Sequence, residues 1–172
     1  MHKESSLTDA VDSFLEQWKR ERPEMEASPM GIVGRLSRTS RLVEHEIRGY
    51  FAEENMEPWE FDVLATLRRS GPPYTLTPKD LVARTMVGSA AMTNRVDRLV
   101  TKSLVTRETD PANRRSILIT LTPEGHDVVE RVVDGHVANA ARLVSDLEPS
   151  ERRELERLLR KLLISLGDTG GA

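Results

Sequence analysis

The sequence predicts a mainly α-helical fold that contains one short β element. Apolar residues recur at helical spacing along most of the 172 residues. One window departs from this pattern, because two β-rich runs, 104–107 and 116–121, flank a charged loop that contains Pro111. Two short helical patterns precede these runs. Helix, turn, helix and hairpin in this order are typical of a winged helix-turn-helix with a two-stranded wing.

Two helices are expected before this window. The first runs from Thr8 to about Arg22, because the residue before Pro23 is pushed out of the helical region. The second begins at Ser28 and Pro29, where serine is the expected N-cap and proline occupies the first turn. The apolar stripe of this second helix consists of Ile32, Leu36, Val43, Ile47, Tyr50 and Phe51.

The next two helices are short and have clear starting signals. Glu57 and Pro58 open a third helix, which is expected to end at Gly71. A fourth helix begins at Thr77, where Asp80 takes the place of the glutamate in a capping box. This fourth helix is the first of the helix-turn-helix pair.

The fifth helix is the predicted recognition helix. Gly88 supplies the turn before it, and Ser89 is a good N-cap. By helical phase one face is apolar and should pack inward, and its members are Met92, Val96 and Leu99. The residues left to face outward are Thr93, Asn94 and Arg98.

Two longer helices complete the chain. Thr122 and Pro123 cap one of them, and Pro149 opens the last. The last helix carries six leucines, Leu155, Leu158, Leu159, Leu162, Leu163 and Leu166. Such a surface packs either within one chain or, as we favour, against a second copy. The winged helix-turn-helix is therefore placed at 58–121, and 1–57 with 122–172 form the predicted helical dimerisation region.

Charge is unevenly distributed along the chain. The net charge of the whole protein is −3. Between Lys79 and Arg115, however, there are eight basic and four acidic residues, so this window is +4 and the remainder is −7. A basic patch on an otherwise acidic protein favours contact with phosphate.

Composition excludes several other classes of function. Cysteine is absent, which excludes disulfides and thiolate metal sites, and no apolar run approaches the length of a membrane span. The N-terminus lacks the apolar stretch of a secretory signal, so we expect a cytoplasmic protein. We find neither a glycine-rich phosphate loop nor a catalytic triad, and His126 and His136 lie too far apart for one metal site on one helix. We therefore expect no enzyme activity, no cofactor and no metal; zinc binding by histidines of two copies of the chain stays an open alternative.

The recognition helix offers suitable groups for double-stranded DNA. Ser89, Thr93 and Asn94 are short polar residues near its N-terminus, and an asparagine can form a bidentate contact with adenine. Arg98 and Lys102 lie further along the helix and are expected to contact phosphate.

The wing is expected to add two arginines. Arg114 and Arg115 follow the tight loop of the hairpin, and one of them can enter the minor groove. Asp110 is expected to hold the other arginine in an ion pair and so to stiffen the hairpin.

The run MTNRVDRLVTKSLVTRETDPANRRSILITLTPEG resembles the DNA-binding core of the MarR family of bacterial regulators. The shared pattern is a hydrophobic-Asp-Arg-Leu segment, a short Leu-Val strand, an Asp-Pro-x-x-Arg-Arg wing and Leu-Thr-x-x-Gly. The arrangement from Ser28 to Leu166 fits the family. The resemblance implies a homodimer, usually a repressor, that binds a palindromic operator and is released from DNA by a small ligand.

Three further segments, QWKRERPEME, EFDVLATLRRSGPPY and MTNRVDRL, resemble the urate-responsive branch of this family, which has an added N-terminal helix. The resemblance implies a pocket for an anionic oxopurine, formed by Trp18, Asp62, Arg95 and Arg107. The residue types suit this role: a tryptophan ring stacks on a planar heterocycle, and Asp62 interrupts an apolar run. Arg95 points away from Thr93 and Asn94 by helical phase and so is available to an anion.

Other interpretations of these residues stay open. Trp18 can serve as an anchor for its helix, and Asp62 with Arg95 can form an ion pair without a ligand. The effector can be another anion, such as citrate or aconitate, or a phenolic compound. The protein can also be a DNA-binding protein that needs no ligand, a partner-binding protein with the same scaffold, or an architectural DNA-binding protein whose affinity hardly depends on sequence.

Overall fold

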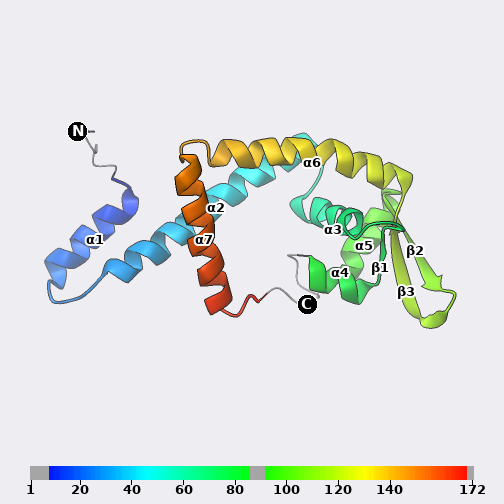
Figure 1. The fold of residues 1–172 in the computed structure, drawn as a ribbon, viewed down its shortest axis with the longest axis horizontal. Coiled ribbons are helices and arrows are strands. Elements are labelled where there is room, and N and C mark those ends of the chain that lie inside the picture. The colour runs from blue at the N-terminus through cyan, green and yellow to red at the C-terminus, as the bar shows by residue number, and fades with distance from the viewer. Residues whose placement is uncertain (1–7, 86–91, 170–172) are drawn as a thin grey trace. The chain divides into compact units, whose positions relative to one another are not determined.

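The computed structural model describes residues 8–85 and 92–169 (Figure 1). These residues form seven helices and three strands, which confirms the predicted mainly α-helical class. No helix in the described part of the chain has the length and apolar character needed to cross a membrane. The chain divides into two compact units, Met1–Glu46 and Ile47–Ala172.

The first unit contains α1 (Ala10–Glu21), which confirms the helix predicted from Thr8. A capping box that the sequence pattern did not reveal starts it. The Asp9 carboxylate accepts hydrogen bonds from the Val11 N–H at 2.7 Å and the Asp12 N–H at 3.2 Å, and the Asp12 carboxylate accepts one from the Asp9 N–H at 2.8 Å. Arg35 forms ion pairs with both aspartates, and its guanidinium holds the pKa of Asp9 below its usual range.

The same unit contains the first part of α2 (Ser28–Glu53), which packs on α1 through small residues. A β-carbon added at Gly31 would lie 3.1 Å from Leu15 Cδ1, and one at Gly34 would lie 3.4 Å from Val11. Ile32, the first residue of the predicted apolar stripe, is 65% exposed within one chain. The close approach of α1 at the two glycines therefore leaves part of the stripe uncovered.

The second unit is built on α3 (Pro58–Arg69), α4 (Pro78–Arg84) and α5 (Met92–Thr101). The predicted capping box of α4 is confirmed: the Thr77 hydroxyl accepts from the Asp80 N–H at 3.2 Å and donates to the Asp80 carboxylate at 2.7 Å. This hydroxyl holds the pKa of Asp80 below its usual range. The largest fully buried apolar side chains of the unit include Phe51, Leu64, Leu67, Leu81, Leu99 and Ile119.

The predicted two-stranded wing is confirmed, and a third, short strand that the sequence did not reveal extends it into a three-stranded sheet. β2 (Val105–Asp110) and β3 (Asn113–Leu121) form the expected antiparallel hairpin, and β1 (Thr75–Leu76) pairs with the other edge of β3. The hydroxyl oxygens of Thr75 and Thr120 lie 2.8 Å apart across this pairing. A two-residue strand is too short to show the alternating pattern by which strands are predicted.

Two helices follow the sheet. Thr122 caps α6 (Pro123–Leu143), whose Val129 and Val132 join the core beneath α3. By contrast, α7 (Pro149–Ser165) buries no residue within one chain. The six leucines of α7 and its C-cap are between 36% and 76% exposed.

Gly125 permits a close approach of α6 to the backbone before β2. A β-carbon at this position would lie 2.1 Å from the carbonyl oxygen of Leu104 and 2.9 Å from Leu121 Cδ1. Gly125→Ala is therefore expected to lower the free energy of unfolding by roughly 2 kcal/mol or more, as overpacking does. Urea unfolding followed by circular dichroism measures this change.

Gly49 in α2 provides the matched control, because a β-carbon there meets no atom within 4 Å. Gly49→Ala is expected to raise stability by about 0.5–1 kcal/mol through helix propensity. Equal destabilisation by the two substitutions would contradict the close approach at Gly125.

His136 of α6 lies among aromatic rings. Its ring centroid is 5.2 Å from that of Phe51 and 5.1 Å from that of Phe61, and its Nδ1 is buried without a hydrogen-bond partner among the described residues. Burial lowers the pKa of His136. As pH falls below the ordinary value of about 6.5, the unfolded chain binds the proton before the folded one does, so stability decreases.

We expect the free energy of unfolding to fall between pH 7 and pH 5, and the slope to be smaller in a His136→Phe variant. Urea titrations at a series of pH values measure this slope. The substitution also changes packing and therefore the free energy of unfolding at every pH, so the two proteins are compared by the dependence of this free energy on pH. An identical pH dependence in both proteins would exclude His136 as its source.

Candidate functional site

The predicted faces of α5 are confirmed by burial. The residues that pack into the core are Met92, Val96 and Leu99. The residues predicted to face outward, Thr93, Asn94 and Arg98, are exposed. A helix that is anchored by one face and polar on the other can present base-reading groups to a DNA groove. Ser89, the remaining predicted base-reading residue, lies outside the described residues.

Two arginines of α5 lie near the indole ring of Trp59 on α3. The guanidinium of Arg98 is 4.8 Å and that of Arg95 is 5.5 Å from the ring centroid, both within cation–π distance. Arg95 is half-buried, and its Nη1 is buried with no hydrogen-bond partner in the described part of the chain. Sequence reasoning predicted the inward direction of Arg95 but missed the ring it meets.

The buried carboxylate of α3 is Glu60 rather than Asp62. Glu60 is 1% exposed, and its Oε2 accepts the Glu57 N–H at 3.0 Å as part of a capping box. Asp62 is half-buried, and its carbonyl oxygen accepts the Thr66 hydroxyl at 2.6 Å. A glutamate three residues after the N-cap is the sequence signal of a capping box, and it identifies Glu60 as the carboxylate that packs against the start of α3.

Lys102, a predicted phosphate contact, forms an ion pair with this glutamate. Its Nζ lies 2.7 Å from Oε1 of Glu60, while the lysine side chain is 44% exposed. The pair joins the C-terminal end of α5 to the N-terminal end of α3. The contact of Lys102 with DNA stays a prediction.

Lys102→Ala removes the cation beside a buried carboxylate. We expect a decrease of roughly 1–3 kcal/mol in the free energy of unfolding, because the partner remains buried and uncompensated. Arg115→Ala, which removes an exposed cation of the wing, should change stability by less than about 0.5 kcal/mol. Thermal and urea unfolding of the two variants measure the difference. An unchanged free energy of unfolding in Lys102→Ala would contradict stabilisation of the fold by the Lys102–Glu60 ion pair.

The other predicted residues of the hairpin are on the surface. Arg114 and Arg115 are exposed, as a DNA-contacting wing requires. The predicted ion pair of Asp110 with an arginine was wrong: its carboxylate accepts the Ala112 N–H at 2.8 Å and so forms the turn of the hairpin. Arg107, predicted for the ligand pocket, is exposed and pairs with Asp97 of α5 at 2.8 Å.

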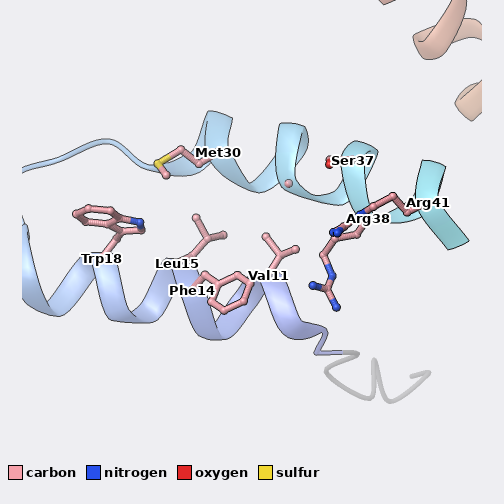
Figure 2. A pocket seen from close by; sticks show the side chains of 9 residues that line it. Val11, Phe14, Leu15, Trp18, Met30, Ser37, Arg38 and Arg41 are labelled. Carbon is pink, nitrogen blue, oxygen red and sulfur yellow. The ribbon is translucent and has the colours of Figure 1, made fainter.

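Trp18 lines a pocket of about 340 Å³ within the first unit (Figure 2). The floor consists of apolar side chains of α1, from which Val11 and Leu15 point toward α2. Trp18 lies at one end of the pocket, and Arg38 and Arg41 of α2 lie at the other. Asp62, Arg95 and Arg107 belong to the second unit and are not among the residues that line this pocket.

Comparison with known proteins identifies the family. Residues 54–116 match the model of the MarR family. The chain is 36% identical over 152 residues to the HTH-type transcriptional regulator PecS of Dickeya dadantii, which covers 88% of this chain and 92% of that protein. The matched family and this relative are transcriptional regulators, not enzymes.

Two solved structures agree with this assignment. BpsR of Bordetella bronchiseptica, whose DNA binding is regulated by 6-hydroxynicotinic acid, has 28% identity and a TM-score of 0.69, covering 81% of this chain and 96% of its own. A mutant MarR of E. coli in complex with operator DNA has 26% identity and the same TM-score, covering 81% and 99%. The chain therefore belongs to the MarR family of DNA-binding transcriptional regulators.

Proposed function

We propose that the protein is a cytoplasmic, homodimeric repressor that binds a palindromic operator and leaves it when a planar anion, urate or a related oxopurine, is bound. The observation that carries this proposal is that α5 combines exposed polar residues with one half-buried arginine. Thr93 and Asn94 are exposed, while Arg95 is half-buried and its Nη1 is buried without a hydrogen-bond partner among the described residues.

The DNA half of the proposal rests on exposure and charge. Asn94 and Thr93, with Ser89, are assigned to base edges, and Arg98 and Lys102 to phosphate. The wing adds Arg114 and Arg115. The exposed leucines of α7 favour a second copy of the chain as partner, and a two-fold dimer places two recognition helices about 34 Å apart on a palindromic site.

The ligand half rests on the chemistry of Arg95. A buried guanidinium nitrogen without a hydrogen-bond partner among the described residues favours an anionic acceptor. Trp18 is assigned to stacking on the ligand, and Asp62 and Arg107 to its polar groups. Because Arg95 belongs to the recognition helix, a ligand that binds its guanidinium shifts this helix. The loss of operator affinity is set by the difference between the ligand's affinities for the DNA-bound and the free conformation.

A second candidate effector is a smaller aromatic acid. The relative BpsR responds to 6-hydroxynicotinic acid, which is also planar and anionic. Citrate, aconitate and phenolic compounds are further candidate effectors for a regulator of the same class.

The test uses an operator obtained by selection from random duplexes. Fluorescence anisotropy of the labelled operator complex is followed while urate, xanthine, citrate or 6-hydroxynicotinate is added. We expect urate to release the DNA, and Trp18→Phe to weaken this response without changing operator affinity. If none of the anions weakens operator binding by the wild-type protein, the ligand half of the proposal is wrong. Equal affinity for operator and random duplex would overturn the DNA half.

A further inference from the structure

The first turn of α3 meets the basic side chains of the recognition helix. Arg98 lies 4.8 Å and Arg95 lies 5.5 Å from the ring centroid of Trp59. The next residue of α3, Glu60, pairs with Lys102 at 2.7 Å, just after the end of α5. The three cations recur at spacings of three and four residues, so they share one helix face. Two consecutive side chains of α3 therefore hold this basic face.

Trp59 is itself held firmly. Pro58 opens α3, and a capping box between Glu57 and Glu60 fixes its first turn. The indole is half-buried and packs against the hydrophobic core. A tryptophan side chain has only two torsions, and partial burial of the ring restrains both. The ring is thus a rigid platform for the guanidinium groups that lie near it.

Arg98 depends on this ring more than its neighbours do. It is exposed, and within the described ranges 8–85 and 92–169 its guanidinium forms no hydrogen bond or ion pair. Lys102 and Arg107, by contrast, are paired with carboxylates. A ring face attracts a guanidinium without occupying its N–H groups, so these donors stay available to a phosphate.

We propose that Trp59 is a positioning residue for DNA binding, which holds the Arg98 guanidinium ready for a phosphate of the operator. Arg98 lies one helical turn beyond Asn94, which is assigned to a base edge. A long exposed side chain loses rotamer freedom when it binds, and the ring removes part of this freedom before DNA arrives. The inference rests on the proposed contact of Arg98 with phosphate and adds the residue that orients it.

A double-mutant cycle of Trp59→Leu and Arg98→Ala tests the coupling, with anisotropy of the selected operator as the readout and no effector present. Over two half-sites, we expect Trp59→Leu to weaken operator binding roughly fivefold or more. In the Arg98→Ala background the same substitution should change affinity by less than about twofold. Trp59→Phe keeps a ring and should lose less than Trp59→Leu. A purely structural role of Trp59 would give equal losses in both backgrounds.

Fluorinated tryptophans separate the charge of the ring face from its shape. Each fluorine withdraws electron density from the indole and weakens its attraction for a cation, while the ring packs almost as before. The chain has two tryptophans, so incorporation into Trp18→Phe confines the label to position 59. Operator affinity relative to this parent should fall stepwise with one, two and three fluorines. It should stay level when the same series carries Arg98→Ala.

The results separate this inference from the assignment on which it rests. If Arg98→Ala leaves operator affinity and its salt dependence unchanged, the phosphate contact of Arg98 is wrong and positioning by Trp59 falls with it. If Arg98→Ala weakens binding but fluorination has no effect, or if Trp59→Leu acts equally in both backgrounds, the phosphate contact stands and the role of Trp59 is overturned.

Discussion

The double substitution Leu155→Asp and Leu162→Asp in α7 is expected to convert the protein to a monomer and to reduce operator affinity by at least 100-fold. The two leucines are seven residues apart and share one helix face, and each is more than a third exposed within one chain. Burial of a leucine against a partner contributes about 1.5–3 kcal/mol, and a two-fold dimer loses each contact twice. A monomer then engages only one half-site.

Sedimentation equilibrium and operator titration measure the two effects. Lys161→Asp introduces the same residue into α7 without removing an apolar side chain, and it should leave the dimer intact. A double variant that remains dimeric would show that α7 is not the partner surface.

Asn94→Ala should have the second-largest effect. Asn94 is exposed on the outer face of α5, and loss of a bidentate contact with a base costs about 1–3 kcal/mol at each half-site. Over two half-sites this is about 2–6 kcal/mol, so we expect operator affinity to fall by roughly 30-fold or more, while affinity for random duplex hardly changes. Anisotropy titrations with both DNAs measure the ratio.

Arg115→Ala is the contrasting variant. It removes a charge of the wing, so it should weaken operator and random duplex by similar factors and reduce the salt dependence of binding. Equal losses on both DNAs for Asn94→Ala would place Asn94 among the phosphate contacts instead.

Local signals in the sequence predicted most of the helical architecture. Prolines and capping residues marked the starts of α3, α4, α6 and α7, because the physics of a helix start is confined to a few neighbouring residues. The phase of α5 was also predictable, since a strongly amphipathic helix has only one apolar face to bury.

Features that depend on distant residues were not predictable in this way. β1 exists because Thr75 and Leu76 pair with the far edge of β3, and two residues carry no pattern of their own. The ring that meets Arg95 comes from α3, 36 positions earlier in the chain. Likewise, Lys102 meets Glu60 only because α5 packs on α3. Such contacts follow from tertiary packing, which overrides any single local signal.

In the proposed mechanism α5 reads DNA with its exposed residues and senses a ligand through the half-buried Arg95. Arg95→Gln tests it most directly, with operator affinity measured by anisotropy in the absence and presence of urate. We expect an operator affinity within about threefold of the wild type, because Arg95 is half-buried and its Nη1 is buried, together with loss of release by urate. Operator affinity that falls as far as in Asn94→Ala, or release by urate that persists in the variant, would contradict the claim.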